Sequence, residues 1–312
     1  MAKTLAEIGP LAREICSEAA RIPLAKRLAA KYQVLVLAFV NGQFIAADRP
    51  ALLVNDRSFL YGDGLFETIR ITNGQPFLWR EHLDRLRRGA DFLKIPLHNS
   101  NDQIEHATRH LLAQNDMPEG FVRIHLSRGE GERGYALPRD PKPTLVITTH
   151  KTQHTEHPGL RLITSTIRVL AGDPLSQYKT ANRLPNVLAR READADDADE
   201  ALLLNNFDQI AEASAANIFI VRGRDLITPP ISAGALAGTT RSFIFKIAAD
   251  HNLTPTESPL TIADLNSADA TFLTSSHWLV TPAGSMDHSA LRTASPAIKS
   301  LRSACEHAAF GF

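Results

Sequence analysis

The sequence lacks the features of disulfide-rich, membrane-spanning or strongly charged proteins. Its 312 residues contain only two cysteines, Cys16 and Cys305, which excludes a disulfide framework and fits a reducing cytoplasm. Lysine and arginine together number 34, as do aspartate and glutamate, so the formal net charge is zero. This balance argues against binding to nucleic acid or to a membrane surface through bulk charge.

Long apolar runs are also absent. The longest candidate, residues 34–40, has the length of a strand and is too short to span a bilayer. Residues 1–31 lack the unbroken apolar middle of a signal peptide, because charged side chains recur along them. We therefore expect a cytoplasmic protein with a helical N-terminal extension over residues 1–35.

The chain is long enough for more than one domain. Its apolar content of 44% is ordinary for a globular protein, and 312 residues can bury a large core. The polar segment 151–158 has no apolar period and ends in Pro158, which predicts a linker. After the extension, we expect a small α+β domain over residues 36–150 and a larger domain over residues 159–312.

Hydrophobic periodicity predicts an alternation of strands and helices. Helical spacing is found over residues 79–93, 104–112, 186–195, 239–250 and 295–308. Asn41-Gly42 predicts a hairpin turn within residues 34–47. Further strands are predicted over residues 64–72, 121–126, 144–149, 160–169, 201–204, 209–213, 218–221 and 270–274. Because strands and helices mix without a strict βαβ rhythm, the pattern favours an α+β fold.

Several familiar active-site patterns are incomplete or absent in this sequence. Residues 129–134 match G-x-G-x-x-G, but the proline-rich residues 135–143 that follow cannot begin the helix that a dinucleotide site needs. His106 and His110 lie one helical turn apart without a third metal ligand, so a solvated helix face is favoured over a metal site. No G-x-S-x-G elbow of a serine hydrolase is present.

Three segments carry residues that could together hold pyridoxal phosphate (PLP). Lys179 lies between an apolar strand and a helix; most lysines are surface charges, but a buried one can form a Schiff base. Glu212 ends a strand and is either a surface group or a partner for the pyridine nitrogen. Residues 238–241 (GTTR) begin a helix, which suits both an N-cap and a phosphate site.

Taken together, these segments resemble the fold-type IV PLP enzymes, which include branched-chain and D-amino-acid aminotransferases and aminodeoxychorismate lyase. The resemblance runs from about residue 38 to 285 and includes residues 61–68 (YGDGLFET), 82–86 (HLDRL) and the E-x-S-x-x-N-x-F segment from Glu212. It implies a two-domain fold similar to D-amino-acid aminotransferase, PLP as the cofactor, and a homodimer with no nucleic-acid or membrane partner.

The resemblance also implies roles for individual residues. Lys179 falls on the catalytic Schiff-base lysine, and Glu212 on the carboxylate that binds the pyridine nitrogen. The other implied cofactor contacts are Arg85, Ser214, Ala215, Asn217, Leu236, Gly238, Thr239, Thr240, Ser275 and Ser276. Freed Lys179 would move the α-proton of the substrate as general base and acid.

Substrate residues are implied by the glycine-rich loop. Residues 127–135 resemble the R-G-x-G-x-R-G-Y loop of many lyases, with Arg133 as a carboxylate binder and Tyr135 where D-amino-acid aminotransferases have histidine. Phe66 replaces the tyrosine of those aminotransferases, and residues 274–276 lack the asparagine of some lyases. An aminotransferase acting on an amino donor and a 2-keto acid is favoured. The alternatives are aminodeoxychorismate lyase and a non-catalytic protein that binds PLP or another small molecule.

Overall fold

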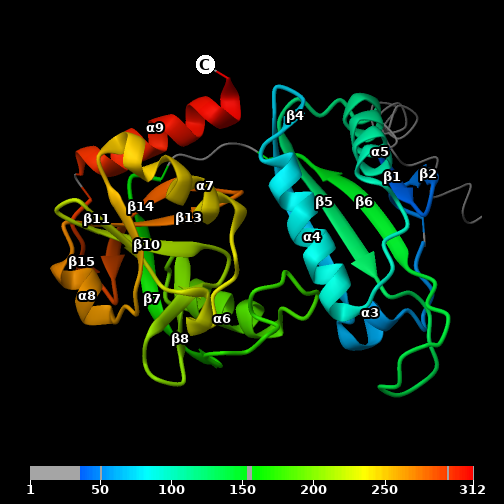
Figure 1. The fold of residues 1–312 in the computed structure, drawn as a ribbon, viewed down its shortest axis with the longest axis horizontal. Helices are drawn as coiled ribbons and strands as arrows, with labels where there is room; N and C mark the ends of the chain where they lie inside the picture. The colour runs from blue at the N-terminus through cyan, green and yellow to red at the C-terminus, as the bar shows by residue number, and fades with distance from the viewer. Residues whose placement is uncertain (1–35, 50, 153–156, 294, 312) are drawn as a thin grey trace, which may run out of the picture. The chain divides into compact units, whose positions relative to one another are not determined.

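The computed structural model describes residues 36–49, 51–152, 157–293 and 295–311. Leu37–Phe312 forms one compact unit that contains two β-sheets with helices packed on them (Figure 1). This architecture confirms the predicted α+β class. The predicted N-terminal helical segment, residues 1–35, lies outside the described residues. So do residues 153–156 of the predicted linker, which falls between the two sheets in the sequence.

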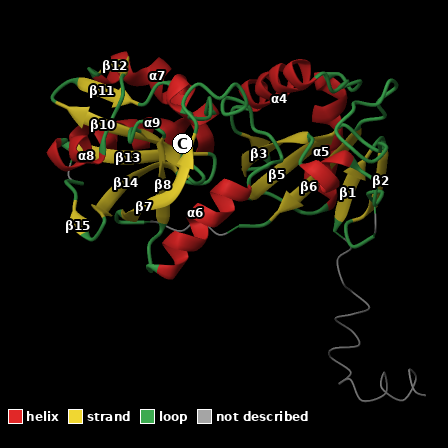
Figure 2. Cartoon of the chain, turned by 90° about the horizontal axis from the view of Figure 1, so that it is seen from below, coloured by secondary structure: helices red, strands yellow, loops and turns green. Residues whose placement is uncertain are grey.

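The first sheet has six strands in the order β2-β1-β6-β5-β3-β4, all paired antiparallel. Asn41 and Gly42 both have positive φ at the predicted turn between β1 and β2, as a type I′ hairpin requires. Helices α4 and α5 pack on this sheet (Figure 2). The elements are β1 (Leu37–Val40), β2 (Gln43–Ala46), α3 (Arg57–Tyr61), β3 (Gly64–Thr72), β4 (Gln75–Pro76), α4 (Trp79–Leu93), α5 (Asn101–Gln114), β5 (Gly120–Ser127) and β6 (Thr144–His150).

Apolar periodicity explains why α4 packs on the first sheet. Leu83, Leu86 and Ala90 share one face of the helix and are at most 2% exposed. They join Ile69 and Ile71 of β3 in one hydrophobic cluster. Fully burying each large aliphatic side chain stabilises the fold by roughly 1.5–3 kcal/mol. This apolar face therefore fixes α4 against β3, and the polar side chains that α4 carries are fixed with it.

The second sheet has nine strands, eight in the order β12-β11-β10-β13-β14-β7-β8-β9, with β15 paired to β14. Strand β7 pairs parallel with β8 and β14, and β11 with β12, while the other pairs are antiparallel. Its strands are β7 (Leu160–Val169), β8 (Glu200–Asn205), β9 (Ile210–Ala213), β10 (Asn217–Arg222), β11 (Asp225–Thr228), β12 (Thr254–Glu257), β13 (Ala270–Ser275), β14 (Leu279–Met286) and β15 (Ser289–Ala290).

The helices of this half range from single 3₁₀ turns to a 15-residue α-helix. They are α6 (Leu184–Ala195), η1 (Ile231–Ala233), α7 (Thr239–Ile247), η2 (Ala248–His251), α8 (Ile262–Ser267) and α9 (Pro296–Phe310), where η denotes a 3₁₀-helix. The predicted helix over 239–250 thus ends as an α-helix at Ile247 and continues as a 3₁₀ turn. Within the part of the chain that the structure describes, no helix is long and apolar enough to cross a membrane.

Strand β14 was not predicted, because Pro282 and Gly284 interrupt its apolar pattern. The structure gives Gly284 a packing reason. A Cβ built on Gly159 would lie 2.9 Å from the Gly284 Cα, so the two glycines allow β7 and β14 to approach closely. No helix follows residues 129–134, which run on as a loop, as the proline-rich residues 135–143 predicted.

Candidate active site

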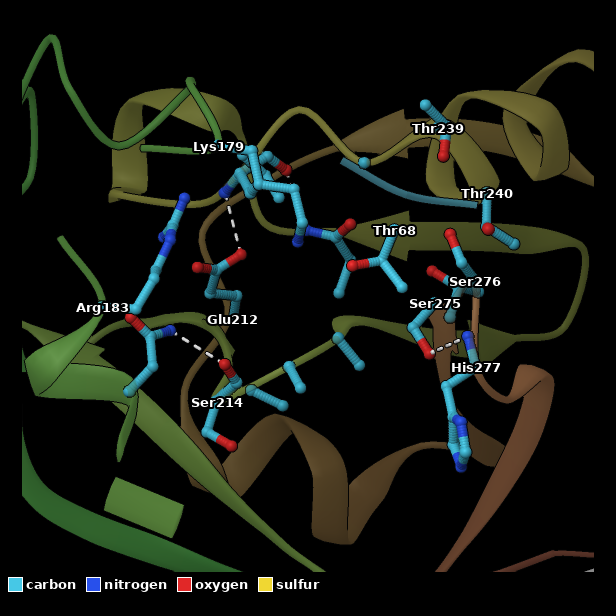
Figure 3. A pocket seen from close by; sticks show the side chains of 18 of the residues that line it. Thr68, Lys179, Arg183, Glu212, Ser214, Thr239, Thr240, Ser275, Ser276 and His277 are labelled. Atoms are coloured by element: carbon cyan, nitrogen blue, oxygen red, sulfur yellow. Dashed lines mark hydrogen bonds between the residues drawn. The ribbon is translucent and has the colours of Figure 1, made fainter. Parts of the chain in front are cut away.

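All twelve residues singled out in the sequence for cofactor binding border one cavity of about 290 Å³. The cavity is lined by segments from both sheets and from the starts of α6 and α7 (Figure 3). Those of its lining residues that were predicted for the site are Phe66, Arg85, Lys179, Glu212, Ser214, Ala215, Asn217, Leu236, Gly238, Thr239, Thr240, Ser275 and Ser276. The predicted substrate residues Arg133 and Tyr135 do not line it.

Lys179 is held on a loop that pairs with the first sheet. The Phe66 amide donates to the Lys179 carbonyl over 2.9 Å, and Thr180 forms an isolated β-bridge with Leu65. The Lys179 Nζ lies 4.8 Å from the centre of the Phe66 ring. Burial, followed by the nearby Arg85 and Arg183, lowers the pKa of Lys179 to about 7. A neutral, nucleophilic amine is therefore available near neutral pH.

Glu212 faces the same cavity from the end of β9 and is 7% exposed. Its Oε2 accepts a hydrogen bond from the Leu236 amide over 2.8 Å, and among the described residues its Oε1 has no hydrogen-bond partner. The Asn217 amide group donates to the Leu236 carbonyl over 2.9 Å, so β9 and β10 fix Leu236 from two sides. Burial raises the pKa of Glu212, although Arg183 opposes the shift. A buried acid of this kind favours a cationic or proton-bearing partner.

The start of α7 has a geometry that suits an anion. Gly238 is the N-cap and provides no side-chain cap, so the first amide groups of the helix have no such partner. A Cβ at Gly238 would lie 2.0 Å from the Asn217 Oδ1, which excludes any larger residue there. Thr239 and Thr240 follow directly and add hydroxyl groups to the cavity wall. Figure 3 shows them on the opposite side of the cavity from Arg183.

A buried ion-pair network lies next to the start of α7. The Arg85 guanidinium binds both carboxylate oxygens of Glu67, over 2.8 and 2.6 Å, and donates to the Ala237 carbonyl over 3.0 Å. The His82 Nδ1 lies 2.7 Å from the same carboxylate, and its Nε2 lies 3.2 Å from the Thr239 hydroxyl. Burial opposes ionisation of Glu67, but Arg85 and then His82 outweigh it and lower the pKa of Glu67 to about 2.

Breaking this network should cost stability in a pH-dependent way. We expect Glu67→Gln to lower the free energy of unfolding by about 3–5 kcal/mol at neutral pH, because it leaves Arg85 buried without its counter-charge. The pKa of Glu67 is lower in the folded protein than in the unfolded chain, so its stabilisation is complete above about pH 4.5 and is lost as the pH falls toward about 2. Urea unfolding from pH 2 to 7 measures both effects.

The matched control is Glu105→Gln, which removes an exposed i,i+4 ion pair with Arg109 on α5. This change should cost less than about 1 kcal/mol, as exposed pairs do. A Glu67→Gln protein as stable as the wild type, or a difference that stays constant down to pH 2, would contradict the expectation.

Seven residues that line the cavity were not predicted from the sequence, and they are Thr68, Arg183, Asn186, Ala213, Ala216, Thr274 and His277. Thr68 could have been found, because it follows Phe66 by two positions on one strand and so faces the same side. Arg183 and Asn186 lie at the start of α6, where polar side chains are usually read as solvated.

Arg70 was also not predicted for the site, and it binds the backbone of two residues that line the cavity. Its guanidinium donates to the carbonyls of Ser276 and His277, and it is 3% exposed. A β3 side chain therefore holds the turn between β13 and β14 that closes one side of the cavity. Burial lowers the pKa of Arg70, whose guanidinium is bound to these neutral carbonyls.

The glycine-rich loop is anchored at its base and exposed at its tip. The Arg57 guanidinium donates to the carbonyls of Gly134 and Ala136 over 3.0 and 3.2 Å, and the Gly134 amide donates to the Tyr61 hydroxyl over 2.9 Å. Tyr135 packs edge-on against Tyr61 but is 86% exposed, and Arg133 is also exposed. The loop is thus held in shape while both predicted substrate residues face solvent.

The amino-acid sequence matches one known enzyme family over most of its length. The family described as Amino-transferase class IV matches residues 64–286, which is more than half of the chain. The chain belongs to the class IV aminotransferases. A D-alanine aminotransferase of Staphylococcus aureus (strain MSSA476) is 31% identical over 254 residues, which cover 80% of this chain and 88% of the relative.

Solved structures agree on the fold of this class IV aminotransferase. A branched-chain aminotransferase from the thermophilic archaeon Thermoproteus uzoniensis, solved with norvaline, has a TM-score of 0.81 and 25% identity, covering 87% of this chain and 94% of that one. A 4-amino-4-deoxychorismate lyase from Pseudomonas aeruginosa has a TM-score of 0.75 and 28% identity, covering 86% and 98%. One fold therefore carries both activities.

Class IV aminotransferases are PLP-dependent enzymes, and the cavity fits this cofactor group by group. The uncapped start of α7 suits a phosphate, and the free Oε1 of Glu212 suits a protonated ring nitrogen. Lys179 supplies an amine whose pKa of about 7 allows it to react with an aldehyde. The phosphate, the ring nitrogen and the aldehyde of PLP thus each have a counterpart in the wall.

Proposed function

We propose that this PLP-dependent aminotransferase uses Lys179 as its cofactor-bearing and proton-transferring amine. The observation that carries the proposal is a lysine with a pKa of about 7 in the same cavity as Glu212 and the uncapped start of α7. When bound, PLP supplies an aldehyde that condenses with amines and a pyridine ring that accepts electrons. Lys179 would hold the cofactor covalently and, when released, would move a proton at the α-carbon of the substrate.

The other residues that line the cavity would bind and orient the cofactor. Glu212 would keep a proton on the ring nitrogen, and the Leu236 amide fixes the direction of its carboxylate. Thr239, Thr240 and the first amides of α7 receive the phosphate, with Arg85 beside them in the wall. Ser214, Ala215, Asn217, Leu236, Gly238, Ser275 and Ser276 complete the proposed cofactor contacts, and Phe66 borders the space where a substrate would bind.

We propose an amino acid or amine as donor and a 2-keto acid as acceptor. Lys179, Arg85 and Arg183 line the cavity, which supports an anionic substrate. The Arg123 guanidinium is outside the lining, 3.9 Å from the centre of the Phe66 ring, and is in no ion pair with any described residue. A guanidinium of this kind is suited to bind a carboxylate. The relatives include a D-alanine aminotransferase and a branched-chain aminotransferase, which makes both enantiomers worth testing.

A substrate panel tests this function. The PLP-loaded protein is incubated with both enantiomers of several amino acids, each with pyruvate or 2-oxoglutarate. We expect turnover that requires the keto acid and that prefers one enantiomer. Pyruvate release from aminodeoxychorismate without a keto acid would instead support the lyase, which the likeness to the Pseudomonas aeruginosa enzyme favours. A protein that neither turns over substrate nor takes up PLP would support the non-catalytic alternative.

We propose a cytoplasmic homodimer in which each subunit extends its glycine-rich loop to the cavity of the other. The anchored backbone and exposed tip of this loop support the proposal, because Arg133 and Tyr135 are exposed and do not line the cavity of their own chain. An exposed arginine at such a tip could hold the substrate carboxylate of the second copy.

Arg133→Ala should therefore weaken substrate binding. We expect KM for carboxylate substrates to rise by about 5–150-fold, the equivalent of the ~1–3 kcal/mol of a charged hydrogen bond. Mixing Arg133→Ala subunits with inactive Lys179→Ala subunits tests the donation between copies. A hybrid dimer then contains one cavity with both an intact Lys179 and a donated Arg133, and its KM should return to the wild-type value. A hybrid that keeps the raised KM would place Arg133 in the cavity of its own chain.

A further inference from the structure

Arg183 lies four residues after Lys179 and folds back over the loop that carries it. The Arg183 Nε donates to the Thr180 carbonyl over 3.1 Å, and the Nη2 donates to the Tyr178 carbonyl over 2.8 Å. The Lys179 carbonyl between them accepts from the Phe66 amide. All three consecutive carbonyls around Lys179 are therefore hydrogen-bonded, two of them by one side chain.

The guanidinium of Arg183 also borders the cavity. It lines the wall together with Lys179 and Glu212, and its Cζ lies 6.0 Å from the centre of the Phe66 ring, against 4.8 Å for the Lys179 Nζ. Figure 3 shows the Arg183 side chain beside Glu212 on the Lys179 side of the cavity. One aromatic ring thus lies within about 6 Å of both cations, a range at which a ring face still attracts a cation.

The charges that act on Lys179 come from four elements. Arg85 and His82 are on α4, Glu67 is on β3, Glu212 is on β9, and Arg183 precedes α6. The Glu67 carboxylate already binds Arg85 at both of its oxygens, so these two charges largely offset each other. Arg183, by contrast, donates to backbone carbonyls and forms no ion pair with a described residue. Among these described groups, it is the positive charge on this side of the cavity without a carboxylate bound to it.

We propose that Arg183 is a positioning residue, which fixes the backbone around Lys179 and supplies the unpaired positive charge that keeps the Lys179 amine neutral and Glu212 anionic. The two effects work through different atoms. The Nε and Nη2 donors of Arg183 fix the loop around Lys179. The positive charge of Arg183 acts through space on Lys179 and Glu212. Burial and then Arg85 and Arg183 lower the pKa of Lys179, and Arg183 is the foremost charge opposing the burial that raises the pKa of Glu212.

This inference rests on the proposed role of Lys179, and the experiment is built to separate the two. Cofactor-free protein is treated with formaldehyde and cyanoborohydride across pH 5–10. The methylation of Lys179 is then measured by peptide mass spectrometry. Only the neutral amine reacts, so the rate reports its protonation without any enzymatic turnover. The wild-type midpoint should lie near 7, the pKa of Lys179.

The variants distinguish charge from shape. In Arg183→Gln the midpoint should rise by about one pH unit, because a like charge near the amine has been removed. Arg183→Lys keeps the charge and should keep the midpoint near that of the wild type. Arg183→Met keeps the length of the side chain without its charge, and it repeats the test if Arg183→Gln does not fold. Arg190→Gln removes an exposed charge from α6 and should leave the midpoint unchanged.

An unmoved midpoint in Arg183→Gln or Arg183→Met would overturn the inference. An equal shift in Arg183→Lys would also overturn it, because loop geometry alone would then account for the effect. The proposed function fails separately, if borohydride reduction of the PLP-loaded wild type does not place the pyridoxyl group on Lys179.

Discussion

Replacing Lys179 with alanine is expected to abolish both covalent attachment of PLP and transamination. The substitution removes the one lysine among the described residues that line the cavity, an amine whose pKa of about 7 permits reaction near neutral pH. Loss of the proton carrier alone costs about 10²–10⁴-fold in rate, and loss of the covalent step adds to this. Borohydride reduction followed by peptide mapping measures attachment, and a keto-acid-coupled assay measures turnover.

The control for this change is Lys246→Ala on α7, whose side chain is exposed. It should keep wild-type labelling and turnover. The phosphate and ring contacts remain in Lys179→Ala, so the variant should still bind PLP reversibly and release it on dialysis. A pyridoxyl group found on another lysine of the wild type, or undiminished turnover in Lys179→Ala, would refute the assignment.

Lys179→Met separates chemistry from folding. The folded protein lowers the pKa of Lys179 from 10.5 to about 7, so the unfolded chain binds more protons between these pH values. The lysine therefore reduces stability at neutral pH, and this loss is recovered as the pH rises toward 10.5. Cofactor-free Lys179→Met should be at least as stable as the wild type at pH 7, yet inactive. A large loss of stability would mean that Lys179 is a structural residue.

Glu212→Gln should reduce turnover without preventing attachment of the cofactor. Glutamine can still accept from the Leu236 amide, but it cannot balance the charge of a protonated ring nitrogen. We expect kcat to fall on the order of 10²–10³-fold, the usual effect of removing one preorganised electrostatic partner. The visible absorption of the loaded protein should show that the cofactor is present, and single-turnover rates should show the loss.

Glu192→Gln is the matched control for this substitution. Its carboxylate accepts hydrogen bonds from Ser165 and Thr166 on β7 and lies outside the cavity wall. Its kcat should stay within a factor of about two of the wild-type value, since it touches no reacting atom. A Glu212→Gln enzyme with normal single-turnover rates would mean that another residue serves the ring nitrogen.

The sequence was sufficient for the fold class and for the position of most of the site. Hydrophobic spacing located α4 and β3, because burial of Leu83, Leu86 and Ile69 dictates those elements. The motif around Glu212 and the threonines of α7 were recognisable because their chemistry is local: one strand end and one helix start each contribute a contiguous group.

The rest depended on contacts between residues far apart in the sequence. Arg70 reaches the turn at Ser276 across 206 positions, and no local pattern distinguishes it from a solvated strand arginine. Arg183 resembles an ordinary residue at a helix start until its side chain is seen to bind the loop before it. Arg57 binds the loop at Gly134, 77 positions away, and Arg133 beside it is exposed, which spacing alone cannot reveal.

The two ties between β3 and the cavity set a limit on how the enzyme can move. The Phe66 amide holds the Lys179 carbonyl, and Arg70 holds the Ser276 carbonyl. A clamshell motion that swings one sheet away from the other would break both ties and carry the reactive amine out of alignment. Substrates and products must therefore enter and leave a cavity whose shape stays constant. Any gating motion is confined to segments outside these two contacts, which can move without displacing Lys179 or Ser276.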